Sequence, residues 1–183
     1  MGGFYNHDKQ TITTDRLILR RFEMSDAQRI YQLCNNYNIY KSTLYLPYPY
    51  PIEAATNWIP THEENFKNDK SYDFAITDKA TGELLGAIGL SNNKTHKNGE
   101  VAYWVGEEYW GKGYGTEALK AVIDFAFDEK GYNRVWARFF ASNPASGKMM
   151  EKVGMVREGV QSQHIIKEGN FEDLVFYGIV REK

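Results

Sequence analysis

The sequence predicts a mixed α+β fold in a single domain. Short apolar segments separated by turn residues are typical of antiparallel strands. Other segments repeat apolar residues at helical intervals, and one glycine-rich stretch joins a strand to a helix. The 183 residues, 42% of them hydrophobic and 25% charged, are enough to bury one core. We expect residues 11–183 to form this domain and residues 1–10 to form a flexible N-terminal segment.

A strand and a helix are expected at the start of the domain. Residues 14–22 carry Leu17 and Leu19 in alternation, which predicts a strand. Ser25 and Gln28 have the spacing of a helix capping box. The following residues place apolar side chains on one helical face, namely Ala27, Ile30, Tyr31 and Cys34.

Residues 43–51 are expected to form a loop. They contain three prolines, which remove main-chain donors and restrict the preceding residues to extended conformations. The tyrosines and prolines of this loop can line an acceptor groove, or they can simply pack over the sheet edge. Helical spacing resumes over residues 51–67, with an interruption expected at Pro60.

The second half of the chain alternates strands and helices. Residues 72–77 and 83–90 flank a turn and predict a β-hairpin. The further expected elements are a strand at 100–105, a helix at 116–130, a strand at 133–141, a short helix from Asn143-Pro144 to near Gly154, and a closing hairpin at 159–166 and 171–180.

Three glycines, Gly111, Gly113 and Gly115, lie between the strand at 100–105 and the helix at 116–130. Glycine permits positive φ and leaves the main chain accessible. The free N–H groups and the dipole of a helix start attract anions, and phosphate is the natural candidate. The stretch matches neither the phosphate-loop motif nor the Rossmann motif. It predicts an anion site, with a purely structural turn as the alternative.

The run Tyr109-Trp-Gly-Lys-Gly-Tyr-Gly-Thr-Glu-Ala118 resembles the pyrophosphate-binding turn of the GNAT N-acetyltransferases, Gln/Arg-x-x-Gly-x-Gly/Ala. Trp110 departs from the general pattern but is typical of the RimJ/RimL-like branch of ribosomal-protein N-terminal acetyltransferases. The resemblance is weak over residues 1–10 and 40–70. It extends to residues 14–20, 99–105, 143–146 and 151–155.

This resemblance implies a fold, a reaction and a cosubstrate. The GNAT fold has a mixed, mostly antiparallel central sheet of about seven strands, splayed in the middle, with helices on both faces. A GNAT enzyme moves the acetyl group of acetyl-CoA directly to a primary amine, without a covalent intermediate on the enzyme. The resemblance implies that the main chain near Trp104 and Val105 holds the pantetheine arm and that Asn143 contacts it from the far side, with Ser146 also on the cosubstrate. The residues implied around the pyrophosphate are Gly111, Lys112, Gly113, Tyr114, Gly115 and Thr116.

Glu100 and Ser146 are the catalytic candidates that the resemblance implies. Glu100 would remove a proton from the amine, directly or through water, and Ser146 would protonate the departing thiolate. The alternative for Glu100 is a half-buried strand residue held by a salt bridge, and Glu107 and Glu108 are carboxylates nearby in the sequence. Ser146 can instead serve only the first turn of its helix, and Lys112 is a phosphate contact or a solvated side chain.

The acceptor follows less directly from the sequence. An α-amino group with a pKa of about 7.8 is roughly one part in seven neutral at pH 7, whereas a lysine amine is neutral in only roughly one part in two or three thousand. A protein α-amino group, such as that of a ribosomal protein, is therefore a coherent acceptor. A small-molecule amine remains an alternative, as does a non-catalytic acyl-CoA-binding regulatory module.

Composition and charge argue against several other classes of protein. The net charge of −2 disfavours direct nucleic-acid binding. No segment approaches the roughly twenty apolar residues of a membrane span. The lone Cys34 fits a reducing compartment, so a cytoplasmic location is expected, and exposed aromatic residues are compatible with a homodimer. No zinc-ligand spacing links the four histidines, and no metal is predicted; they are His7, His62, His96 and His164.

Overall fold

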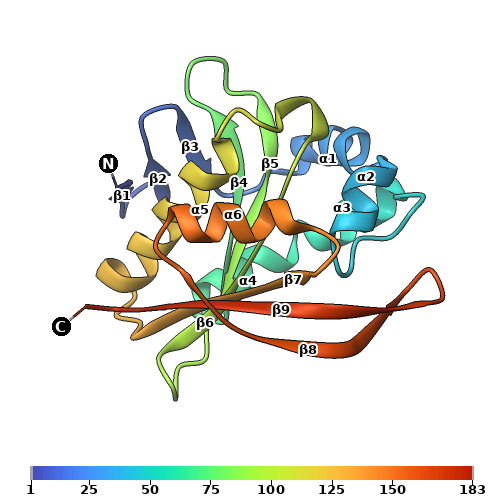
Figure 1. Ribbon diagram of the computed structural model, residues 1–183. Coiled ribbons are helices and arrows are strands. Elements are labelled where there is room, and N and C mark those ends of the chain that lie inside the picture. The colour runs from blue at the N-terminus through green and yellow to red at the C-terminus, as the bar shows by residue number, and fades with distance from the viewer. Residues whose placement is uncertain (1, 183) are drawn as a thin grey trace.

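A computed structural model of the protein describes residues 2–182 and contains, in this range, one nine-stranded sheet with the order β1-β2-β3-β4-β5-β6-β7-β9-β8 (Figure 1). Met1 and Lys183, the outer bounds of the expected segments, lie outside the described residues. The strands are β1 (Phe4–Asn6), β2 (Thr11–Thr13), β3 (Leu17–Arg20), β4 (Ser71–Asp78), β5 (Leu84–Ser91), β6 (Asn98–Val105), β7 (Arg134–Phe140), β8 (Val156–Lys167) and β9 (Asn170–Val180).

The seven predicted strands are present, and two more precede them. β1 and β2 are three residues each and pair with one another as a hairpin. Residues 1–10 were expected to lie outside the domain as a flexible segment, whereas Phe4–Asn6 extend the sheet by one strand. Strands this short have too few residues for an alternating pattern to be visible.

The sheet is splayed in the middle, as predicted. Among the strand pairs of residues 2–182, β6 and β7 alone run parallel. Their pairing covers only Asn98–Glu100 with Arg134–Trp136, so the remainder of the two strands diverges. Residues 101–105 of β6 therefore pair with β5 on one side and face a gap on the other.

The helices largely follow the predicted spans. The break at Pro60 is confirmed, since α3 ends at Trp58 and α4 begins at Thr61. The short α2 had no prediction. The helices are α1 (Ala27–Cys34), α2 (Tyr37–Ser42), α3 (Ile52–Trp58), α4 (Thr61–Lys67), α5 (Tyr114–Asp124), which continues as a π-helix over Phe125–Glu129, and α6 (Pro144–Lys152).

The capping box before α1 differs from the predicted pair, Ser25 and Gln28. A single 3-10 turn, Met24–Asp26, precedes the helix, and the Glu23 N–H donates to Asp26 Oδ2 at 2.8 Å. Asp26 also accepts hydrogen bonds from the Arg20 guanidinium at 2.8 Å. The carboxylate reaches both the main chain and Arg20, which the hydroxyl of Ser25 cannot replace.

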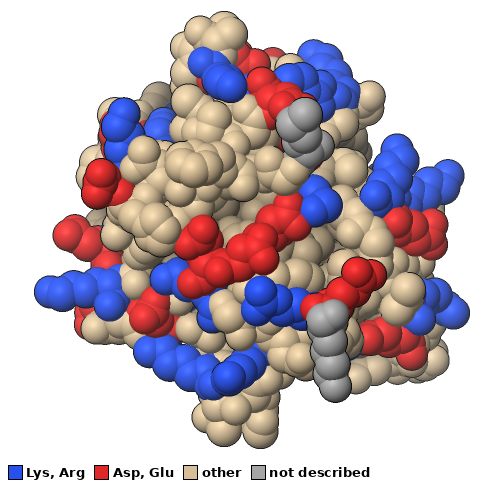
Figure 2. All heavy atoms as spheres, turned by 90° about the vertical axis from the view of Figure 1, so that its left-hand side faces the viewer, with Lys and Arg blue, Asp and Glu red and all other residues tan. Residues whose placement is uncertain are grey.

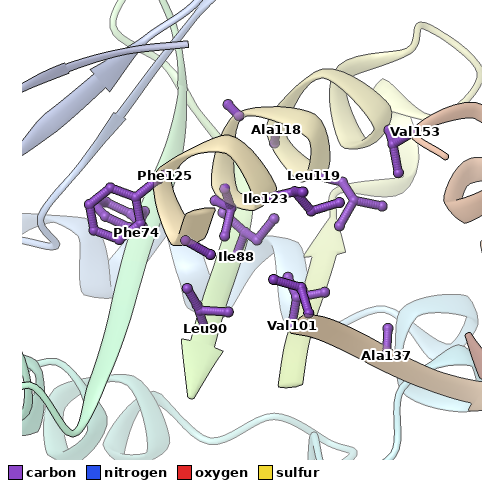
Figure 3. Close-up of a cluster of buried hydrophobic side chains, with 14 of the residues drawn as sticks. Phe74, Ile88, Leu90, Val101, Ala118, Leu119, Ile123, Phe125, Ala137 and Val153 are labelled. Atoms are coloured by element: carbon purple, nitrogen blue, oxygen red, sulfur yellow. The ribbon is translucent and has the colours of Figure 1, made fainter. Parts of the chain in front are cut away.

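The main core lies between the sheet and the helices α5 and α6. Figure 3 shows α5 over the strands, with Leu119 and Ile123 directed toward Ile88 and Val101. A second cluster packs α1 and α3 on the opposite face, against Ala75 of β4 and Leu84 of β5. Cys34 belongs to this second cluster, where burial raises the pKa of its thiol to about 12 and confirms a packing role.

Replacing Leu119 with alanine tests the main core. Leu119 is fully buried, so L119A is expected to lower the free energy of unfolding by about 2–5 kcal/mol through lost burial and a residual cavity. Urea denaturation measures this loss. The control V180A removes two methyl groups at a position that is 54% exposed and is expected to change the stability by less than about 0.5 kcal/mol. Equal losses in both variants would contradict the proposed packing.

The described surface carries charges of both signs. Figure 2 shows one face, on which Lys and Arg side chains are interspersed with Asp and Glu. Ion pairs of the described residues include Lys120 with Asp124 and Arg134 with Glu158. In residues 2–182, no helix is long and apolar enough to cross a membrane, and no group of three or more His, Cys, Asp or Glu side chains is arranged to hold a metal ion.

Candidate active site

The glycine turn before α5 has the backbone that the sequence predicts. Gly111 and Gly113 have φ values of +75° and +82°, which strain any residue with a Cβ atom. The first main-chain bond into the helix is donated by Glu117 N–H to the Gly113 carbonyl at 3.0 Å. The N–H groups of residues 114–116 thus precede the helical ladder and are available to an anion. The turn can hold a diphosphate.

Arg16, from the loop before β3, fixes the turn in place. Its Nη1 donates to the Lys112 carbonyl at 2.8 Å, and its Nε donates to Glu117 Oε2 at 2.7 Å. The guanidinium also lies 4.7 Å from the centre of the Tyr114 ring. Lys112 places its ammonium 5.5 Å from the centre of the Tyr109 ring. Two cations therefore surround the glycines, and Arg16 is a site residue that the sequence reading missed.

The main chain of Val105 faces the gap between β6 and β7, whereas that of Trp104 faces β5. Gly106 N–H donates to the Leu85 carbonyl on β5 at 2.8 Å, and successive residues of a strand direct their polar groups to opposite sides. Accordingly, the Val105 carbonyl accepts a hydrogen bond from Trp110 Nε1 at 2.7 Å. Trp110, the residue that departs from the general motif, thus connects the glycine turn to the end of β6.

Asn143 and Ser146 meet at the start of α6. Asn143 occupies the N-cap position, but its Nδ2 donates to Ser146 Oγ at 3.1 Å instead of its side chain accepting a main-chain N–H. Because Ser146 Oγ accepts this bond, its own proton is free to be donated. Asn143 was expected to contact pantetheine from the far side of the gap, and it also orients Ser146.

The hydroxyl of Tyr103 is a further proton donor at the same place. It is buried and, within residues 2–182, has no hydrogen-bond partner of good geometry. Burial raises the pKa of Tyr103 to about 12, although the nearby Ser146 hydroxyl acts in the opposite direction. The phenol therefore stays protonated at neutral pH and lies beside Ser146. Nothing in the sequence pattern distinguished it from other strand tyrosines.

Glu100 is ion-paired. Its Oε1 accepts from Arg138 Nε at 2.8 Å, and both side chains are about one-quarter exposed, at 24% and 21% respectively. This is the salt-bridged arrangement weighed as the alternative for Glu100. Glu107 and Glu108 lie outside the gap, between β6 and the glycine turn. Glu107 accepts a hydrogen bond from Asn38, and Glu108 accepts one from Arg29.

A cavity of about 260 Å³ is lined by Glu100, Tyr103 and Ser146 among other residues, whereas the glycine turn, Val105 and Asn143 do not line it. Tyr103 packs with the α5 side of the sheet, whereas Trp104 packs with the α1 and α3 side, so the cavity passes through the gap from one face to the other. Thr43–Leu46 of the predicted loop line it, while Tyr50 is buried in the second core. One part of the loop therefore borders the cavity, and the other part packs against the sheet. The charged and hydroxyl-bearing side chains on the wall are Ser42, Thr43, Tyr45, Asp73, Glu100, Tyr103, Arg138 and Ser146.

Comparison with known proteins identifies the family. Residues 16–156 match the family model for the acetyltransferase (GNAT) domain. This chain belongs to the GNAT acetyltransferase family. The uncharacterized N-acetyltransferase YoaA of Bacillus subtilis is 30% identical to it over 175 residues, which cover 94% of this chain and 97% of YoaA. The [ribosomal protein uS5]-alanine N-acetyltransferase of Escherichia coli is 24% identical, with coverage of 93% and 90%.

Solved structures agree in fold with this GNAT acetyltransferase. RimL, a ribosomal L7/L12 alpha-N-protein acetyltransferase in complex with coenzyme A, superimposes with a TM-score of 0.84 at 18% identity, covering 91% of this chain and 95% of RimL. The ribosomal-protein-S5-alanine acetyltransferase of Vibrio fischeri gives 0.82 at 22% identity, with coverage of 93% and 96%. The predicted resemblance, reaction class and cosubstrate are confirmed: the protein is an N-acetyltransferase that uses acetyl-CoA.

The GNAT site contains residues for which the sequence offered only weak signals. Arg16 belongs to the opening Thr14-Asp-Arg-Leu stretch, which resembles the family but carried no assigned role. Trp58, Asp73 and Arg138 lie in elements that were correctly predicted, yet which face of each element borders the cavity depends on tertiary packing. A spacing pattern cannot supply that information.

Proposed function

We propose that the acceptor of this acetyltransferase is the α-amino group of a protein, such as a ribosomal protein. The observation that carries the proposal is the cavity through the sheet, which brings Ser146 together with the loop residues Thr43–Leu46. A chain end can enter from the loop side while acetyl-CoA occupies the gap. The uS5-alanine acetyltransferase of Escherichia coli, which aligns along 93% of this chain, supports the same acceptor class.

In the proposed mechanism the pantetheine arm lies in the gap as an added strand. Its amides pair with the main-chain groups of Tyr103 and Val105 that face the gap, beside Asn143 and the side chain of Trp104. The diphosphate is held by the N–H groups of the turn, with Arg16 and Lys112 adding positive charge. This binding fixes the thioester near the acceptor amine, which lowers the entropic part of the barrier.

Proton transfers complete the proposed reaction. The neutral amine forms a C–N bond at the thioester carbonyl, the C–S bond breaks, and the departing thiolate takes a proton from Ser146 Oγ. The Tyr103 hydroxyl stands beside Ser146 and can replace that proton. Glu100 is retained as the proposed proton acceptor through water, with Arg138 holding its carboxylate in a fixed position.

Release of coenzyme A thiol during incubation with a panel of amines tests the acceptor. We expect peptides that begin with a free alanine or serine to be acetylated, and the same peptides with a blocked N-terminus to be inert. Turnover restricted to spermidine or an amino sugar would favour the small-molecule alternative. Tight coenzyme A binding without turnover of any amine would favour the non-catalytic module. Mass spectrometry of a treated cell extract then names the product.

We also propose a cytoplasmic location and a homodimer. The buried free thiol of Cys34 supports a reducing compartment. β8 forms one edge of the sheet and exposes apolar side chains that a second copy can cover, namely Val156, Val160 and Ile166. Sedimentation equilibrium gives twice the monomer mass if the dimer forms, and the monomer mass otherwise.

A further inference from the structure

Asp73 presents a carboxylate to the cavity from the middle of β4. Its neighbours Tyr72 and Phe74 pack in the main core under α5, so Asp73 faces the opposite side of the sheet, the side of α1 and α3. The residues beside it in the same row are Gly89 on β5 and Ala102 on β6. A Cβ atom at Gly89 would lie 2.5 Å from Asp73 Oδ1. The small residues therefore keep open the space that this carboxylate faces.

The Asp73 carboxylate lacks a counter-charge. The Ser71 hydroxyl donates to its Oδ2 at 3.0 Å, but no lysine or arginine in the described chain forms an ion pair with it. The other carboxylate of the cavity, Glu100, has its charge balanced by Arg138. A carboxylate that is shielded from water and has no neighbouring cation is energetically unfavourable. Binding of a cation beside Asp73 is therefore favoured.

His62 on α4 does not provide that cation. The residue is 3% exposed, and its ring packs edge-on against Trp58 with ring centres 4.2 Å apart. Both ring nitrogens lack a partner among residues 2–182. Burial lowers the pKa of His62 and the positive charge of Arg21 lowers it further, although Asp73 acts in the opposite direction. The neutral form of the ring is therefore favoured, and His62 supplies no fixed positive charge to Asp73.

We propose that Asp73 holds the ammonium group of the acceptor at the end of the cavity bordered by Trp58, and so selects cationic amines. This inference rests on the proposed function, because it assigns the group that receives the amine. Amines with a pKa of about 7.8 or above are mainly ammonium ions at pH 7 and match the missing cation. The ring of Trp58, which also lines the cavity, favours a cation as well.

The same contact prepares the amine for attack. One N–H proton passes from the ammonium to an oxygen of Asp73, which leaves a neutral amine whose lone pair forms the C–N bond. The nitrogen then loses its second proton through water to Glu100, the acceptor proposed above. After the product leaves, the Asp73 carboxyl group releases this proton to solvent. Burial raises the pKa of Asp73, with His62 and Ser71 acting against it, and this brings the carboxyl closer to the amine in proton affinity. The other ionisable groups on the cavity wall are the Glu100–Arg138 pair, Tyr45 and Tyr103.

A binding experiment with two small probes tests Asp73 without requiring turnover. L-alaninamide carries an α-ammonium group, and L-lactamide carries a hydroxyl group in its place. With coenzyme A at saturation, we expect the wild-type protein to bind L-alaninamide about tenfold more tightly, as measured by NMR titration at pH 7. D73N is expected to reduce this preference to less than about twofold while its coenzyme A affinity is unchanged.

Two further variants make the result specific. D128N makes the same chemical change at a residue that is 71% exposed and does not line the cavity, so it should keep the wild-type preference. G89A should weaken the preference as D73N does, because its methyl group displaces the Asp73 carboxylate, and it serves if D73N does not fold.

The outcomes separate this inference from the proposed function. A wild-type protein without a preference overturns the inference, as does a D73N protein that keeps one. A preference abolished by E100Q and kept in D73N assigns the ammonium to Glu100 and overturns it equally. If the protein acetylates peptides but its preference for L-alaninamide does not depend on Asp73, only this inference is overturned. If the preference depends on Asp73 but the protein acetylates no peptide, only the proposal of a protein acceptor is overturned.

Discussion

G111E is expected to weaken coenzyme A binding by about a hundredfold. The new carboxylate stands in the turn that receives the diphosphate, and two like charges about 5 Å apart at an effective dielectric constant of about 20 repel by roughly 3 kcal/mol. Gly111 has a φ of +75°, and a Cβ atom added there would have no protein atom beyond its chain neighbours within 4 Å. Isothermal calorimetry with coenzyme A measures the loss.

Gly82 provides a closely matched control for this variant. Its φ is also +75°, its Cβ position is equally open, and it lies in the turn between β4 and β5. G82E should therefore have a similar backbone strain and the same change of net charge, but bind coenzyme A like the wild-type protein. If G111E kept wild-type affinity, the turn would be structural only, and the diphosphate would have to be held elsewhere.

S146A is expected to lower kcat by about a hundredfold and to leave the affinity for coenzyme A within about twofold. Without the hydroxyl, the thiolate leaves unprotonated, and removal of a general acid typically costs a factor of about 10²–10⁴. Steady-state kinetics with the best peptide of the acceptor panel measures kcat, and calorimetry measures the affinity.

The neighbouring Ser142 gives the control for the serine substitution. It is exposed, and its hydroxyl donates to Glu172 at 3.2 Å, away from the gap. S142A should keep wild-type kcat. If S146A also kept kcat within twofold, Ser146 would not be the acid; the buried Tyr103 hydroxyl would then take that role, and Y103F would show the large loss instead.

Most of the fold was predictable because its signals are local. Short apolar runs on either side of a turn marked the strands of the 72–90 hairpin, Pro60 marked the break between α3 and α4, and the glycines marked the start of α5. The missed elements, β1, β2 and α2, are three to six residues long and carry too few apolar positions for a period to stand out. The capping box was misplaced because Asp26 has a second partner, Arg20, that only the folded chain brings near.

The residues of the site likewise divide into those that local sequence signals predict and those that only the tertiary fold brings together. The glycine turn is a local geometry and could be predicted in position and conformation from the sequence. Arg16 reaches that turn from about one hundred residues away, and Asp73 becomes a cavity residue only because Gly89 and Ala102 stand beside it on neighbouring strands. Glu100 lies on the predicted strand, but its ion pair with Arg138 depends on where β6 and β7 begin to diverge.

A crystal structure of the protein with bound coenzyme A tests the central claim most directly. We predict that the diphosphate oxygens lie within hydrogen-bond distance of the N–H groups of residues 111–116 and that the pantetheine arm lies between β6 and β7 against Val105. Coenzyme A bound elsewhere, with the turn and the gap free of it, would contradict the account.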